Sequence, residues 1–88
     1  MPREILDFTE NNDLPKATAV QVYEMRRLAM EEVGRLRSDD SLDEAARQQQ
    51  IDRIQSEIQQ AAAAALGEKA YRQYLDGKGR WMTNVTGL

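Results

Sequence analysis

The sequence of 88 residues contains no cysteine and no histidine. These absences exclude disulfide bonds, thiol nucleophiles, zinc sites built from cysteine or histidine, serine–histidine triads and imidazole pH switches. We therefore expect no enzymatic activity, no small-molecule substrate and no cofactor or metal site. Long apolar runs are also missing, since no stretch approaches the roughly 18–20 apolar residues that a membrane-spanning helix needs.

Charge of one sign is only slightly in excess, with 15 acidic and 12 basic residues and a net charge of −3. An acidic excess disfavours nonspecific binding to nucleic acid. The balance is uneven, because residues 1–68 carry 8 basic and 14 acidic groups whereas residues 69–88 carry 4 and 1. The first ten residues show no signal-peptide pattern. The compartment stays open at this point: cytoplasmic for the chain as it stands, and the cell envelope or periplasm for a fragment of an exported parent.

Helix breakers are few, with only two prolines and five glycines in the chain. Alanine, glutamate, glutamine, arginine and leucine dominate, and all of them favour helices. Strand-forming residues never alternate over a useful length. The sequence therefore predicts an all-α domain over residues 1–77, followed by an irregular tail over residues 78–88. The expected helices are two short ones and two long ones: residues 3–12, 15–37, 42–66 and 68–76.

The two long helices are expected to lie antiparallel in a hairpin, because a short connection joins segments of similar length. Each carries an apolar stripe at helical spacing. In the first long helix the stripe consists of Val22, Met25, Ala29, Val33 and Leu36. In the second it consists of Ile51, Ile54, Ile58, Ala61 and Ala65. These stripes predict where the two helices touch.

The expected core is thin, and a small domain with a thin core is marginal without a partner. Two helices alone cannot enclose a core, so terminal helices or a second copy of the chain should cover the exposed apolar edge. A bundle-like homodimer is favoured over a monomer. The predicted core residues are Val22, Met25, Ala29, Val33, Leu36, Ile51, Ile54, Ile58, Ala62, Leu66 and Tyr71.

Local signals mark the ends of the long helices. The stretch at residues 41–44 matches a capping box, in which Ser41 and Glu44 bond to each other's backbone N–H groups. Gly67 is the expected residue just beyond the end of the second long helix. Ion pairs one helical turn apart are expected for two pairs of residues, Glu31 with Arg35 and Glu68 with Arg72.

Two groups of carboxylates are candidates for chemistry. The first group consists of Asp39, Asp40, Asp43 and Glu44. Hard cations bind such oxygens, but the EF-hand pattern is absent, and helix capping and solubility explain the cluster better. The second group, Glu31 and Glu32, pairs carboxylates as acid–base catalysis does. These two residues lie on the predicted surface face beside arginines, so a solvated surface is the favoured interpretation.

The C-terminal residues suggest one further class of ligand. Lys78, Arg80 and Trp81, together with Tyr71 and Tyr74, would suit the phosphates and bases of a nucleic acid. The stretch around Lys78 lacks the P-loop spacing. Packing of the aromatic rings over the open end of the hairpin is favoured.

Methionine residues can form adaptable binding surfaces. Met25 belongs to the apolar stripe and is expected in the core, whereas Met82 lies in the tail. Met30 lies at the edge of the stripe. Of these, Met30 is the better candidate for a surface that meets a partner.

Three stretches taken together carry a resemblance. The first comprises Leu14-Pro15, Thr18-Ala19 and Val22-Tyr23. The second comprises Leu36-Arg37, Asp39 and Ser41-Leu42. The third comprises Leu66-Gly67, Ala70-Tyr71, Tyr74 and Trp81. Their combination resembles C-terminal helical modules of uncharacterised bacterial proteins, many of them exported.

More distantly, a helical hairpin that ends in L-G-x-x-x-Y is similar to small periplasmic stress proteins of the Spy/CpxP type and their heavy-metal-resistance relatives. The resemblance implies an all-α protein that binds unfolded clients or partner proteins. The L-T-x-x-Q motif of that group is absent, and residues 13–16 stand in its place. We predict a non-catalytic helical protein-interaction module of a bacterial protein. The alternatives are a Spy-like periplasmic chaperone or envelope stress component, and weak nucleic-acid binding through the tail.

Overall fold

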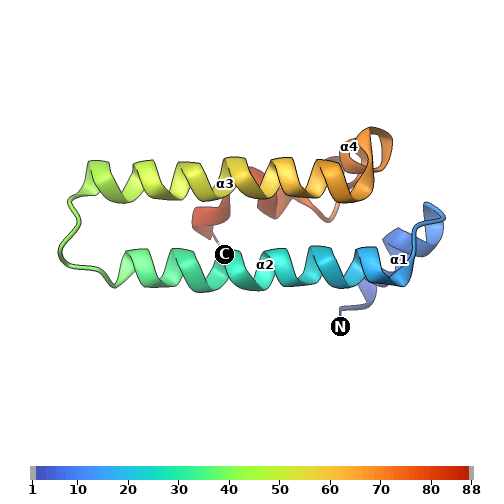
Figure 1. The fold of residues 1–88 in the computed structure, drawn as a ribbon, viewed down its shortest axis with the longest axis horizontal. Coiled ribbons are helices and arrows are strands. Elements are labelled where there is room, and N and C mark those ends of the chain that lie inside the picture. Colours follow the sequence, from blue (N-terminus) through green and yellow to red (C-terminus); the bar gives the residue numbers. More distant parts are fainter. Residues whose placement is uncertain (1, 88) are drawn as a thin grey trace.

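The computed structural model describes residues 2–87, which form four α-helices and a short C-terminal segment. The helices are α1 (Arg3–Asn11), α2 (Lys16–Arg37), α3 (Glu44–Leu66) and α4 (Glu68–Asp76). The C-terminal segment contains two 3-10 turns, η1 (Arg80–Thr83) and η2 (Val85–Gly87). Helices α2 and α3 run antiparallel, with the loop at one end and α1 and α4 at the other (Figure 1). The expected all-α hairpin is confirmed, and residues 2–87 contain no strand.

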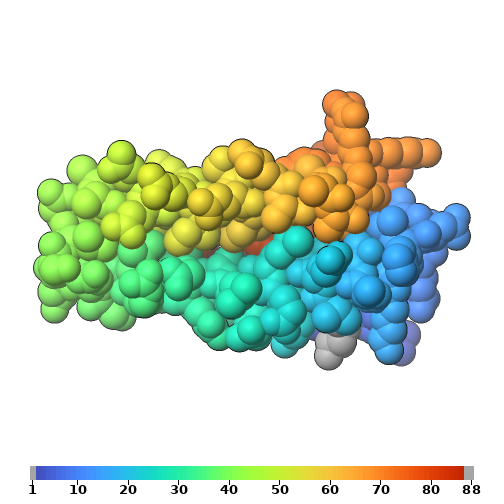
Figure 2. All heavy atoms as spheres, in the orientation of Figure 1, coloured from blue at the N-terminus to red at the C-terminus, as the bar shows by residue number. Residues whose placement is uncertain are grey.

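The hairpin has two faces with different surroundings. The C-terminal segment lies against one of them, because η1 packs on α3 and α4 while η2 packs on both α2 and α3. We call this side the covered face. The opposite side, the open face, is the one seen in Figure 2, where α2 and α3 lie side by side with no other segment in front of them.

The N-cap of α3 differs from the predicted one. The carboxylate of Asp43 accepts a hydrogen bond from the backbone N–H of Ala46 at 2.7 Å, so Asp43 is the N-cap and α3 begins at Glu44. The predicted capping box of Ser41 and Glu44 is therefore wrong. Ser41 instead donates from its hydroxyl to Asp39 at 2.5 Å. A carboxylate is a good N-cap because it also interacts favourably with the helix dipole.

Arg47 ties this loop to the end of α2. Its guanidinium donates to the backbone carbonyls of Leu36 at 3.0 Å, Asp39 at 3.0 Å and Leu42 at 3.1 Å. The last carbonyls of a helix have no partner within the helix, and they attract positive charge. Arg47 thus satisfies the C-terminal end of α2 from the first turns of α3.

The turn from α3 into α4 follows the prediction. Gly67 has a φ of +83°, which favours glycine, and its N–H bonds to the carbonyl of Ala63 at 2.9 Å. It ends α3 and α4 begins at the next residue, so the predicted role of Gly67 is confirmed. The predicted ion pair of Glu68 with Arg72 is also present, at 2.6 Å.

The core agrees with the predicted stripes in most positions. Met25, Ile54, Ile58 and Tyr71 are only half-buried. In the second stripe Ala61 is exposed, because the contact side of α3 drifts toward Ala62 near its C-terminal end. The predicted core residues that are fully buried are Val22, Ala29, Val33, Leu36, Ile51, Ala62 and Leu66.

The expectation of an irregular tail over residues 78–88 is wrong for the part that the structure describes, while residue 88 lies outside it. Met82 and Val85 are both 0% exposed. Gln59 donates to the carbonyl of Met82 at 2.7 Å, and Gln55 accepts from the N–H of Val85 at 3.3 Å. The segment is ordered because its apolar side chains complete the core and α3 satisfies its backbone.

Candidate functional site

The candidate site is a hollow on the open face between α2 and α3, with a volume of about 390 Å³. We call it the open groove. Apolar side chains supplied by both helices form most of its lining, and two glutamates complete it. Its lining residues are Met25, Leu28, Ala29, Glu32, Ile54, Glu57, Ile58 and Ala61.

Leu28 is the most informative residue of the open groove. It is 51% exposed, although α2 buries Ala29 beside it. The half-buried Ile54 and Ile58 lie across from it on α3. Isolated exposed apolar residues are common on proteins, whereas several in one hollow mark a binding surface. The groove therefore presents apolar surface that the fold itself does not cover.

The charges around the open groove are balanced. Glu32 is paired with Arg35 at 2.6 Å, and the hydrogen bond from this arginine lowers the pKa of the Glu32 carboxyl. Arg53 lines an adjoining hollow that shares Glu32 and Ile54 with the groove. Within residues 2–87, neither Arg53 nor Glu57 takes part in an ion pair. The groove thus offers one neutralised pair and two free charges of opposite sign.

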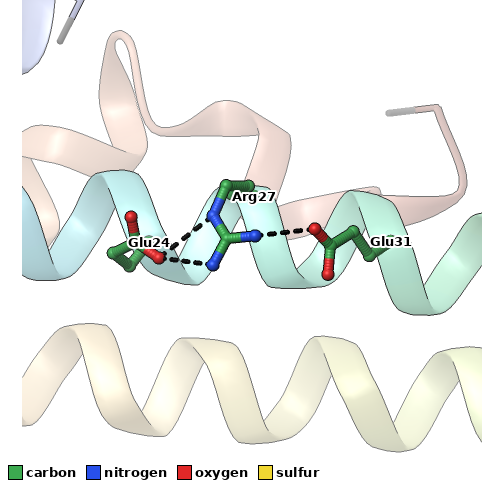
Figure 3. A network of polar contacts seen from close by, with 3 residues as sticks. All are labelled: Glu24, Arg27 and Glu31. Atoms are coloured by element: carbon green, nitrogen blue, oxygen red, sulfur yellow. Dashed lines mark hydrogen bonds and ion pairs between the residues drawn. The ribbon is translucent and has the colours of Figure 1, made fainter.

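The candidate carboxylates Glu31 and Glu32 are both held by arginines. Arg27 binds Glu24 at 2.7 Å and Glu31 at 2.6 Å, and these carboxylates, Glu24 first, raise the pKa of Arg27 (Figure 3). The predicted pair of Glu31 with Arg35 is wrong, because Arg35 binds Glu32 instead. Both carboxylates are exposed and each is bound to an arginine, as the predicted solvated surface requires.

The candidate cation cluster near the loop is used for capping. Asp43 caps α3, and hydrogen bonds from Ser41 lower the pKa of the Asp39 carboxyl. Asp40 and Glu44 are exposed. No group of three or more metal-binding side chains comes together in the described part of the chain. The structure thus brings these acidic residues together only as helix-end and turn residues.

The candidate aromatic surface at the C-terminal end is largely occupied by internal packing. Tyr74 is buried, and its ring stacks on Phe8 with the ring centroids 5.0 Å apart. Trp81 donates from its indole N–H to the Tyr74 hydroxyl at 3.1 Å, and the guanidinium of Arg26 lies 5.9 Å from the indole ring centre. Tyr71, which lies on α4 with Tyr74, is half-buried.

The three candidate methionines lie in three different surroundings. Met82 is in the core and Met25 lies in the open groove. Met30 is 50% exposed but is not part of that groove. The sequence singled out Met30, and it missed Leu28. Leu28 directly precedes Ala29, so a helical projection places it on the flank of the same apolar stripe.

A second hollow, of about 480 Å³, lies between α1 and α4. Its charged lining residues, among them Glu4, Asp7 and Lys78, are exposed. Deep ligand sites bury most of the ligand and converge a few fixed polar groups on it. Most of its lining residues are polar or charged, whereas the lining of the open groove is mostly apolar, so the open groove is the better candidate.

Comparisons of the chain with family models, with curated proteins and with solved structures found no match. The resemblance to bacterial helical modules and to Spy/CpxP-type proteins therefore stays a prediction. No helix within residues 2–87 is both long enough and apolar enough to cross a membrane.

Proposed function

We propose that the chain is a non-catalytic helical protein-interaction module of a bacterial protein, with the open groove as its binding surface. The observation that carries the proposal is the contrast between the faces of the hairpin. The C-terminal segment seals one face, while Leu28 and its apolar neighbours remain uncovered on the other.

The shape of the open groove suits a helical partner. Two parallel or antiparallel helices present a furrow whose walls are rows of side chains, and a third helix packs into such a furrow through residues spaced three and four apart. Met25, Leu28, Ile54 and Ile58 supply walls of this kind along the length of the groove. An extended peptide would find no backbone hydrogen-bond partners there, because the N–H and C=O groups of α2 and α3 already bond to each other within each helix.

The experiment selects helical peptides from a display library against the purified chain and measures their affinity by fluorescence anisotropy. Leu28→Glu should weaken the selected peptides at least about tenfold, because it places a charge at an apolar contact. Met30→Glu is the matched control, since Met30 lies on the same helix and is equally exposed. Peptides that bind both variants as well as the unmodified chain would contradict the proposal.

The chaperone alternative uses the same apolar surface with less selectivity. A chaperone should suppress aggregation of an unfolded client protein at substoichiometric amounts, and Leu28→Glu should abolish the effect. A selective interaction module should leave aggregation unchanged.

The nucleic-acid alternative depends on the exposed Lys78 and Arg80. It has less support, because Tyr74 and Trp81 are engaged in packing. It predicts salt-dependent retention of nucleic acid that the double variant Lys78→Ala/Arg80→Ala abolishes.

A further inference from the structure

We infer that the occupant of the open groove is a second copy of this chain, bound face to face and antiparallel so that the two hairpins form a two-layered four-helix bundle. This inference rests on the proposed function, since it names the partner of the same groove. It is argued from the charges, the size and the symmetry of the open face.

The two free charges at the groove are self-complementary. Arg53 and Glu57 lie one turn apart on α3, and the order arginine-then-glutamate is the less favourable one for a pair within a helix. A two-fold axis crossing the middle of α3 brings Arg53 of each copy opposite Glu57 of the other, because a symmetric contact joins residue i to j and j to i. The dimer would therefore contain two Arg53–Glu57 pairs between the copies, and these pairs would neutralise all four of the charges.

The same axis pairs the apolar residues. It places Ile54 of each α3 opposite Ile58 of the other, and Leu28 of each copy against α2 of the other. Like Met25 and Ala61, these three residues are left half-buried or exposed in the groove by the fold. Glu32 is already paired to Arg35, and the free Glu57 of the lining has the free Arg53 beside it, so the charges favour neither a strongly basic nor a strongly acidic partner. A balanced surface of this kind fits its own copy.

The open face is large enough for a stable contact. The molecule measures 45 × 23 × 18 Å, and Figure 2 looks along its shortest dimension onto the open face. A face with an outline of 45 × 23 Å has room for a contact of about 800 Å² per partner, which is the size of a standard specific interface. The covered face could not serve, because the C-terminal segment occupies it.

The test measures molar mass by sedimentation equilibrium from low micromolar to millimolar concentration. The unmodified chain should approach twice its mass of 10.0 kDa. Leu28→Glu should weaken the dimer about a hundredfold, because two copies each lose an apolar contact and gain a charge in it. Met30→Glu should leave dimerisation unchanged. Circular dichroism checks that each variant keeps its helix content.

A charge exchange tests the pairing independently of Leu28. Arg53→Glu and Glu57→Arg should each weaken the homodimer at least about tenfold, because each replaces attraction by repulsion at two symmetric places. Mixing the two single variants should restore dimers, since one copy then carries two acidic side chains and the other two basic ones. Single variants that dimerise normally, or a mixture that stays monomeric, would overturn the arrangement.

The outcome for the dimer can be separated from the outcome for the proposed function. If the unmodified chain is monomeric at every concentration but still binds helical peptides through Leu28, the second copy is the wrong partner and the interaction surface stands. If it dimerises through Leu28, the selected peptides should compete with the dimer. A dimer that forms equally well with Leu28→Glu and with Met30→Glu would overturn the inference.

Discussion

The covered and open faces of the hairpin use similar residues to opposite effect. Ile51 is 3% exposed, whereas Ile54 and Ile58 on the same helix are only half-buried. Ile51 joins a core cluster with the fully buried Val85 of the C-terminal segment. The difference shows that a few residues after α4 decide which half of the apolar surface becomes core and which half stays available.

The comparison also shows how little chain is needed to close one face. Two short turns supply Met82 and Val85, which have no exposed surface. Gln55 and Gln59 on the adjacent flank of α3 bond to their backbone. No such segment lies on the open face among residues 2–87 (Figure 2). The open face therefore has apolar side chains but no internal partner for them.

The largest expected effect comes from truncating methionines in the three surroundings. Met82→Ala should destabilise the fold by about 3 kcal/mol, Met25→Ala by about 1 kcal/mol and Met30→Ala by less than about 0.5 kcal/mol, because the loss follows burial. Urea denaturation of dilute protein measures all three. Equal losses for Met82 and Met25 would mean that the covered face and the open face contribute equally to the stability of the monomer.

The next effect concerns the close packing that leads into the C-terminal segment. A Cβ atom added at Gly79 would collide with the buried ring of Tyr74. Gly79→Ala should therefore cost about 2 kcal/mol by overpacking. Gly34→Ala is the control, because nothing lies within 4 Å of its added Cβ, and it should stabilise α2 by up to about 1 kcal/mol. Thermal melts should thus shift in opposite directions, and a shift of the same sign would be inconsistent with this packing.

A smaller effect is expected from the hydrogen bond that fixes η1. Gln59→Ala leaves the carbonyl of Met82 without its donor and should cost about 1 kcal/mol. Amide exchange in η1 and η2 should accelerate while exchange in the middle of α2 stays unchanged. Gln60→Ala, at the exposed neighbouring position, should change neither. Uniform acceleration along the chain would argue against a separately attached segment.

The smallest effect at neutral pH should come from Tyr74→Phe, which removes a hydroxyl that accepts from Trp81. Its main consequence is at high pH. Burial raises the pKa of Tyr74 above the ordinary value of 10.0, so the folded state holds this proton more tightly than the unfolded state. Stability from this source is complete below about pH 10 and is lost as the pH rises through the folded pKa.

Denaturation measured between neutral and strongly alkaline pH tests this prediction. The unmodified chain should lose stability above pH 10, and Tyr74→Phe should lose less. Tyr71→Phe is the control, because Tyr71 is less buried on the same helix. If all three proteins lose stability in parallel, the alkaline transition does not arise from Tyr74.

The sequence by itself determined the helices, their ends at Arg37 and Leu66, and the stripe that joins α2 to α3. These follow from local propensity and from periodicity, which depend on neighbours along the chain. It also determined the break between α3 and α4 at Gly67, because the backbone has a positive φ there and glycine adopts such a conformation without strain. The predicted N-cap at Ser41 was wrong because Ser41 and Asp43 are both good N-cap residues and lie two positions apart. In the folded chain it is the Asp43 carboxylate that accepts from the N–H of Ala46.

Only the tertiary structure decided which flank of the hairpin is covered and which is open. The apolar stripe on α3 predicts the contact with α2, but periodicity alone does not say which flank of that contact will be covered. The choice was made by the C-terminal segment, whose Met82 and Val85 reach α2 and α3 from far along the chain. Such long-range burial depends on where chain ends meet in space, so the exposure of Leu28 became visible only in the folded molecule.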